Sequence, residues 1–174
     1  MAEFDVFNGD ADGIISLVQL RRAEPRPDAK VVTGRKRDVA LLEKIDAKAG
    51  DDVTVLDISM RTNGDALRRI LKNGAHVFYV DHHNPGDIPE HDNLQAIINT
   101  SAEMCTAVLV DRCLEGAYRA WAVTAAFGDN FPKLAYRLAN DETYPLETLN
   151  RLGTLINYNA VSYTHLTLPT TSRV

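Results

Sequence analysis

Acids and imidazoles follow three apolar segments of the chain, at the points where turn residues begin. The groups are Asp10 and Asp12, Asp57, and Asp81-His82-His83. A short apolar run bounded by glycine, proline or asparagine is typical of a buried strand that ends in a polar loop. Carboxylates favour Mn²⁺ and Mg²⁺, and neutral imidazole also binds Mn²⁺. This mixed set of ligands therefore predicts a metal site, with Mn²⁺ as the first candidate.

Each group alone also has a plainer interpretation. The segment Asn8–Gly13 is a polar turn in which an aspartate caps the next helix, and Asp57 is a helix cap. Two exposed loop histidines are the alternative for the third group. A calcium loop of the EF-hand type is excluded, because Gln19 stands where a bidentate glutamate is required. Phosphatases of the haloacid-dehalogenase type also place Asp-x-Asp after a strand, but they give Asp81-His82-His83 no role.

Strands and helices are expected to alternate through the first hundred residues. Strands are predicted at 3–8, 30–33, 53–56, 75–80 and 95–98, with helices at 14–22, 38–47, 65–71, 101–110, 118–127, 131–139 and 146–156. This order predicts an α/β fold with a doubly wound, mainly parallel five-stranded sheet flanked by helices, and a helical C-terminal segment. Ligands of such sheets bind beyond the carboxyl ends of the strands, where all three groups lie.

The composition is that of a globular domain with a sizeable core: 174 residues, of which 45% are hydrophobic and 25% charged. The net charge of −5 excludes a surface that is basic throughout. No apolar stretch approaches the roughly 20 residues that span a bilayer, and the N-terminus lacks the features of a signal peptide. Cys105 and Cys113 lie two turns apart on one predicted helix, too far for a disulfide. We expect free, mostly buried thiols and a cytoplasmic protein.

Taken together, these groups resemble the motifs of the DHH phosphoesterase superfamily. Asn8-Gly9-Asp10-Ala11-Asp12-Gly13, Asp57, Asp81-His82-His83 and Gly128-Asp129 occur in the order and rough spacing of its four motifs, over about residues 3–140. Members are similar in their catalytic domain across single-strand exonucleases, nucleotide and oligonucleotide phosphatases, cyclic-dinucleotide phosphodiesterases and pyrophosphatases. The resemblance implies hydrolysis of a phosphoester in a nucleotide or short single-stranded oligonucleotide, through activation of water by two divalent ions, Mn²⁺ before Mg²⁺.

The resemblance also implies a role for each residue of the motifs. Asp10 would bind the first ion, Asp12 the second, and Asp57 would bridge both. His82 and Asp129 would complete the second site, His83 would contact the scissile phosphate, and Asp81 would orient the histidines.

One position departs from this pattern. Many members have a histidine ligand four residues before the first motif aspartate, and Val6 stands there. A catalytically degenerate module that binds a nucleotide or metal is therefore the alternative function, and a manganese-dependent pyrophosphatase is a second alternative.

Substrate contacts are expected from three places. Asn8 precedes the first motif, and Ser101 either caps the next helix, presenting N–H groups to a phosphate, or is a plain cap. The segment Arg35-Lys36-Arg37 follows the second strand, and with nearby basic residues it either holds the other phosphates of the substrate or is a solvated helix start. No membrane partner is expected, and the oligomeric state is left open.

Residues 161–174 differ in character from the rest of the chain. They contain four threonines and no acid, and resemble a translated sequencing adapter joined to a truncated gene. We expect a catalytic domain over residues 1–160 followed by a non-native tail. Several members of the superfamily carry a second, smaller domain with a glycine-rich, histidine-containing segment. No such segment occurs here, so we expect that domain to be absent and turnover by this chain to be poor.

Overall fold

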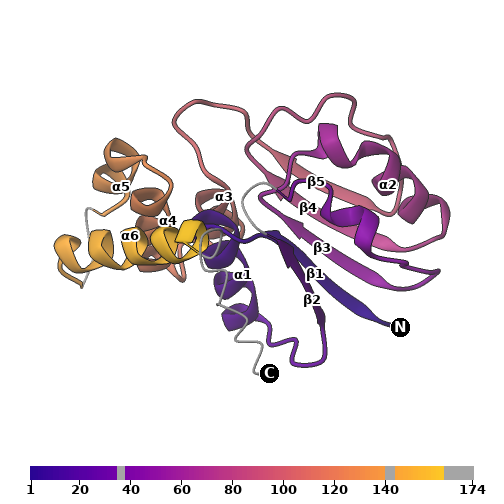
Figure 1. Cartoon of the computed structure of the whole chain (residues 1–174), viewed down its shortest axis with the longest axis horizontal. Helices are drawn as coiled ribbons and strands as arrows, with labels where there is room; N and C mark the ends of the chain where they lie inside the picture. Colours follow the sequence, from indigo (N-terminus) through magenta and orange to yellow (C-terminus); the bar gives the residue numbers. More distant parts are fainter. Residues whose placement is uncertain (35–37, 140–143, 163–174) are drawn as a thin grey trace, which may run out of the picture.

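The computed structural model describes residues 1–34, 38–139 and 144–162 and has an α/β architecture with a parallel sheet (Figure 1). The elements, in chain order, are β1 (Glu3–Asn8), α1 (Ala11–Ala23), β2 (Lys30–Gly34), the 3₁₀ helix η1 (Leu41–Lys44), β3 (Asp52–Leu56), α2 (Met60–Lys72), β4 (His76–Asp81), β5 (Leu94–Ile98), α3 (Thr106–Cys113), α4 (Arg119–Gly128), α5 (Pro132–Leu138) and α6 (Leu146–Ser162). All five predicted strands are present, within one residue of the expected boundaries.

The five strands lie in the order β2-β1-β3-β4-β5, and every neighbouring pair is parallel. The chain moves outward from β1 to β2, then crosses back over β1 to β3. The strand order therefore reverses between β1 and β3. In open α/β sheets, the crevice at the carboxyl ends of two such strands is where ligands bind. Asp10 and Asp57 follow these two strands.

Both faces of the sheet are covered, which confirms the doubly wound arrangement. Phe7, Leu56 and Val80 point to the side of α1 and α3, in a core that continues into α4, α5 and α6. Val6 and Tyr79 point to the other side, where they pack with η1 and α2. Figure 1 shows α2 and η1 on one side of the sheet and α1 and α3 on the other, with α4–α6 stacked beyond them.

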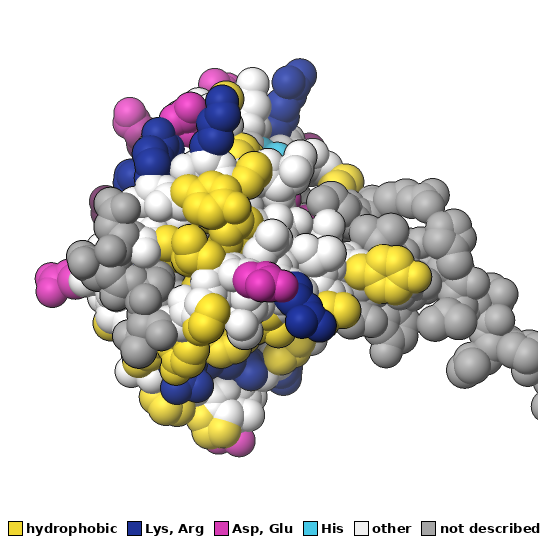
Figure 2. Space-filling model, turned by 90° about the vertical axis from the view of Figure 1, so that its left-hand side faces the viewer, with side chains coloured by type: hydrophobic (Ala, Val, Ile, Leu, Met, Phe, Trp, Pro, Cys, Tyr) yellow, Lys and Arg dark blue, Asp and Glu magenta, His cyan; other side chains and the backbone are white. Residues whose placement is uncertain are grey.

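The outer face of the helical segment is mixed in character. Figure 2 shows this side of the molecule, with hydrophobic side chains scattered among charged ones. Tyr136 on α5 and Leu155 on α6 are 58% and 57% exposed. These helices therefore bury mainly their inner faces, against α1 and α4. Within the described parts of the chain, no helix is both long and apolar enough to cross a membrane.

The helix expected at 38–47 does not form, and only Leu41–Lys44 adopts a single 3₁₀ turn. Side chains of α2 instead satisfy the backbone of this segment. Asn63 accepts a hydrogen bond from the Leu42 N–H (3.1 Å) and donates to the Val39 carbonyl (2.7 Å). Because these polar groups are paired through side chains, the segment buries Leu41, Leu42 and Ile45 without the hydrogen bonds of an α-helix. Val39, expected on the apolar face, is 49% exposed.

Two other expectations need adjustment. Cys105 is buried, but Cys113 at the end of α3 is exposed, so only one thiol is in the core. Helix α6 runs to Ser162, two residues into the segment expected to be a non-native tail. Residues 163–174 lie outside the described residues, and the tail therefore stays a prediction.

We predict that Asn63→Ala destabilises the protein, because it leaves the buried Leu42 N–H without its partner. An unpaired buried group costs about 1–3 kcal/mol, which lowers the urea midpoint of unfolding. Asn150→Ala, on the exposed side of α6, is the control and should change the free energy of unfolding by less than about 0.5 kcal/mol. Equal midpoints for the two variants would contradict this role of Asn63.

Candidate metal centre

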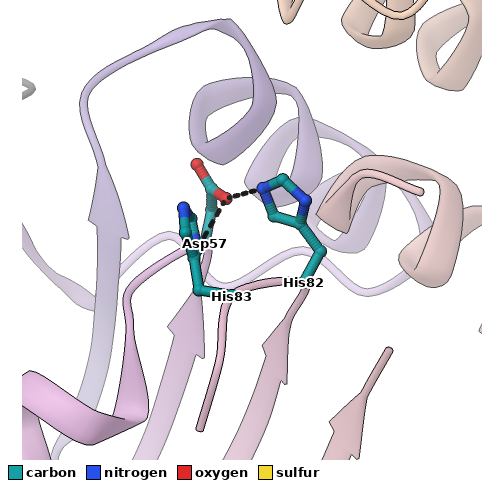
Figure 3. Close-up of side chains that lie close together, drawn as sticks. All are labelled: Asp57, His82 and His83. Carbon is teal, nitrogen blue, oxygen red and sulfur yellow. Dashed lines mark ion pairs between the residues drawn. The ribbon is translucent and has the colours of Figure 1, made fainter. Parts of the chain in front are cut away.

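The acids and histidines meet at the carboxyl edge of the sheet, where they line a cleft of about 220 Å³. Asp10 follows β1, Asp57 follows β3, and His82 and His83 follow β4. Asp129 reaches the same cleft from the end of α4. Figure 3 shows the two imidazole rings on either side of the Asp57 carboxylate. The cleft lies where the strand order reverses, as the topology predicts.

Two overlapping groups of side chains bring metal-binding atoms together. Asp57, His82 and His83 form one group, and Asp12, His82 and Asp129 form the other; within each, the ligand atoms lie within 4.8 Å of one another. His82 Nε2 belongs to both, at 3.4 Å from Asp57 Oδ1, 3.8 Å from Asp12 Oδ2 and 4.0 Å from Asp129 Oδ2. A single imidazole nitrogen thus faces three carboxylates.

A backbone carbonyl fixes the orientation of His82. Its Nδ1 lies 2.8 Å from the carbonyl oxygen of Met104. A carbonyl oxygen only accepts, so Nδ1 carries a proton, and Nε2 is the ring atom left to bind a metal ion. This arrangement is how proteins hold a metal-binding histidine in one tautomer. The ring of Phe131 packs against the same imidazole in a T-shaped arrangement, with the two ring centroids 6.1 Å apart.

Asp81 contacts both residues that follow it. Its Oδ1 accepts hydrogen bonds from the backbone N–H of His82 (2.9 Å) and from Nδ1 of His83 (2.7 Å). The bond to buried Asp81 is the largest influence on His83 and raises the pKa of its imidazole above 6.5, against the opposing effect of burial. His83 is 44% exposed, so it stands at the mouth of the cleft and favours the charged form.

Asp57 lies in a sharp turn directly after β3. Its φ of 58° is in the left-handed region, and its N–H donates to the Val80 carbonyl at 3.0 Å. This conformation is costly for residues other than glycine, asparagine and aspartate. The side chain is 2% exposed. Burial, followed by the charges of Asp12, Asp10 and Asp81, raises the pKa of Asp57 well above 3.8. So many carboxylates in a buried place are compatible with a cation between them.

Asp12 has a structural role in addition to its expected one. Its Oδ2 accepts from the N–H of Thr106 and its Oδ1 from the N–H of Ala107, both at 2.7 Å. The fully buried carboxylate is therefore the cap of α3, although it belongs to α1. Each oxygen keeps a second lone pair, so Asp12 can cap α3 and bind a metal ion. Asp10 likewise caps α1, where it accepts from the Gly13 N–H at 3.3 Å.

Thr106 is a residue of the site that the sequence did not reveal. Its hydroxyl donates to Asp57 Oδ1 at 3.1 Å, while its N–H donates to Asp12. The helix that Ser101 was expected to cap begins only at Thr106. Ser101 is exposed, and its hydroxyl accepts from the Glu103 N–H at 3.4 Å, within a turn. The expected cap is therefore wrong, because Asp12 caps α3 from a distant part of the chain.

Close helix packing positions Asp129. A Cβ on Gly128 would lie 2.9 Å from the Gly153 carbonyl oxygen, and one on Gly153 would lie 2.3 Å from the Thr124 carbonyl oxygen. Helices α4 and α6 can therefore approach this closely only because both positions are glycine. Asn130, with a φ of 62°, then turns the chain away at the end of α4. The contact with α6 fixes where Asp129 enters the cleft.

Three of the basic residues near the segment Arg35-Lys36-Arg37 in sequence, Arg21, Arg26 and Lys30, have structural partners. Arg21 and Arg26 pair with the buried Asp5, at 2.6 and 3.2 Å. The ammonium group of Lys30 lies 5.2 Å from the ring centroid of Phe4. Arg35, Lys36 and Arg37 lie outside the described residues. Of the expected substrate contacts, Asn8 does line the cleft and donates to Asp10 Oδ2 at 3.2 Å.

We predict that Thr106→Val weakens Mn²⁺ binding by about 10–100-fold, the usual effect of removing a group that orients a metal ligand. Valine keeps the shape of the side chain and the N–H to Asp12, but removes the bond to Asp57. Thr106→Ser keeps that hydroxyl and should bind Mn²⁺ as the wild type does. Isothermal titration of the three proteins tests this role, and equal affinity of the valine variant would refute it.

Comparison with known proteins places the fold. No family model matches the sequence, and no curated protein matches it. Among solved structures, a DHH-domain protein described as a member of the s1p family of ribosomal proteins superposes with a TM-score of 0.69 and 16% identity, over 93% of this chain and 48% of that one. Exonuclease RecJ bound to manganese superposes with a TM-score of 0.58 and 18% identity, over 91% and 53%. The chain thus spans about half the length of these two proteins, and it has the fold of a DHH-type domain.

Proposed function

We propose that this chain is the catalytic part of a metal-dependent phosphoesterase that hydrolyses a phosphoester of a nucleotide or short single-stranded oligonucleotide. The observation that carries this proposal is His82, whose Nε2 faces three carboxylates at the point where the strand order reverses. The similar exonuclease is described as bound to manganese, which supports Mn²⁺ as the ion, with Mg²⁺ as the alternative.

The donor set suits two divalent ions. Asp10 would hold the first and Asp12, His82 and Asp129 the second, with Asp57 between them. Ions bound there would lower the pKa of a water molecule and stabilise the charge on a phosphoryl group. Carboxylate oxygens with one oriented imidazole are ligands that both Mn²⁺ and Mg²⁺ accept, and the imidazole favours Mn²⁺.

His83 would act on the substrate directly. Its Nδ1 is held by Asp81 and its raised pKa favours the protonated ring, so Nε2 is a donor at the mouth of the cleft. Such a donor can stabilise negative charge on a phosphate oxygen, or give its proton to the leaving oxygen. Asp81 is then a positioning residue that keeps the donor aimed.

The size of the cleft limits what enters it. Its volume of about 220 Å³ is below the roughly 300–1,000 Å³ of pockets that enclose a drug-sized ligand. We infer that a phosphoryl group enters the cleft, where Asn8 is a proposed contact, while the rest of the nucleotide lies outside. Ser101 and the segment Arg35-Lys36-Arg37 are further proposed contacts of the substrate.

A degenerate binding module is the second candidate function, and one observation favours it. Val6 is fully buried in the core between the sheet and α2, so it supplies no ligand to the first ion. An enzyme and a degenerate module differ in how many ions they bind and in whether any substrate is hydrolysed.

We predict that Asp57→Asn stabilises the metal-free protein at neutral pH. The folded-state pKa of Asp57 is raised above 3.8, so its contribution to stability is complete below that value and is lost as pH rises through the folded-state pKa. Asparagine has no such loss and tolerates a positive φ. Urea unfolding at pH 5 and pH 8 should show an advantage of the variant that grows with pH, while Asp87→Asn shows none. An advantage independent of pH would contradict this cause.

We predict Mn²⁺-dependent hydrolysis of at least one substrate among pyrophosphate, adenosine bisphosphate, dinucleotides and single-stranded DNA. Asp57→Asn should abolish both Mn²⁺ binding and turnover. His83→Ala should keep Mn²⁺ binding but lower kcat by about 10²–10⁴-fold, the usual contribution of a proton-transfer group. Hydrolysis of none of these substrates, with Mn²⁺ bound, would favour the degenerate module; pyrophosphate alone would identify a pyrophosphatase.

A further inference from the structure

The two sides of the cleft are unequally supplied with ligands. The side of β4 and α4 brings His82 and Asp129 to Asp57 and Asp12. On the side of β1, the motif residues that line the cleft are Asn8 and Asp10. The side chain of Val6 is buried in the core between the sheet and α2 and has no atom that binds a metal ion, so the first ion has few donors.

Asp38 lines this same cleft, and the motifs give it no role. It belongs to the connection that follows β2, the neighbour of β1. Gly34, the last residue of β2, lies beside Asn8 in the parallel register. Asp38 therefore lines the cleft together with Asn8 and Asp10, on the side where donors are few.

Glycines at two positions allow the end of β2, the Asp10 loop and Asp38 to approach one another closely. A Cβ on Gly9 would lie 2.2 Å from the carbonyl oxygen of Gly34, so the loop packs directly on the end of β2. A Cβ on Gly34 would lie 2.6 Å from Cβ and 2.9 Å from Oδ2 of Asp38. Because neither position carries a side chain, the Asp38 carboxylate packs against Gly34, and Gly34 packs against the Asp10 loop.

We propose that Asp38 is a ligand of the ion on the Asp10 side of the cleft, in place of the side chain that Val6 does not supply. This inference rests on the proposed function. With Asp10, Asp57 and Asn8, which line the same cleft, it would make a site of oxygen donors only, whereas the other site includes the imidazole of His82. Oxygen-only sites suit Mn²⁺ and Mg²⁺, and imidazole adds affinity for Zn²⁺. The two sites should therefore differ in the metal that they select.

The test is the number and affinity of bound Mn²⁺ ions, measured by isothermal titration of the whole chain. Asp38→Asn keeps the size of the side chain and removes its charge. This substitution should lower the affinity for one of the two Mn²⁺ ions by about tenfold or more, the smallest usual effect of losing a group that supports a metal ion. Asp129→Asn should lower the affinity for the other Mn²⁺ ion. Asp46→Asn, an exposed acid on the same β2–β3 connection, should bind both ions as the wild type does.

The electron paramagnetic resonance spectrum gives a second readout, independent of activity. The wild type with two Mn²⁺ should show the spectrum of a coupled pair, and Asp38→Asn at the same metal concentration should show an isolated ion. Two ions bound by the wild type and equally tightly by Asp38→Asn would refute the role of Asp38 and leave the proposed function standing. If Asp46→Asn lowered the Mn²⁺ affinity as much as Asp38→Asn does, the role of Asp38 would also be refuted, because the loss would then follow from removing any nearby negative charge. Fewer than two ions in the wild type would overturn both proposals.

Discussion

The carboxylate of Asp12 is the contact on which the rest of the centre depends. It lies at the start of α1, yet it accepts both free N–H groups at the start of α3. This one side chain therefore joins the sheet half of the molecule to the helical half. Through α3 it places Thr106 against Asp57, and the turn just before α3 places the Met104 carbonyl against His82. Loss of this contact would release ligands on both sides of the cleft together.

The same contact helps to offset the electrostatic cost of the site. Buried carboxylates near one another repel, and the raised pKa of Asp57 reflects that repulsion together with burial. The N-terminus of α3 carries partial positive charge, which stabilises the Asp12 carboxylate. In the metal-free protein, the raised pKa of Asp57 favours its protonated form, which lowers the remaining repulsion, and a bound cation would replace that proton. Stability without metal and readiness to bind metal are thus opposed at Asp57.

The sheet and the acids at its edge could be predicted from the sequence, because both depend on local pattern. Continuous apolar strands mark buried parallel strands, and parallel strands bring their carboxyl ends to one edge. The failures have a common cause. The helix expected at 38–47 is replaced by backbone contacts to Asn63, and the cap expected from Ser101 is supplied by Asp12. Thr106 and Asp38 were missed for the same reason: their place in the site comes from partners distant in sequence, which local patterns do not encode.

The charge of the cleft bears on how the proposed metal ions and substrate would bind. The described residues that line it include four aspartates and no lysine or arginine. Arg21 on α1 and Arg26 after it do not reach the cleft, because they are paired with Asp5, earlier on β1. A phosphate would therefore meet the negative charge of these described residues when no metal ion is bound. Bound cations are often the largest local charges in such a site and reverse its sign. Under the proposed function, a bound metal ion would therefore raise the affinity of this cleft for a phosphorylated substrate, and that affinity would depend on metal concentration.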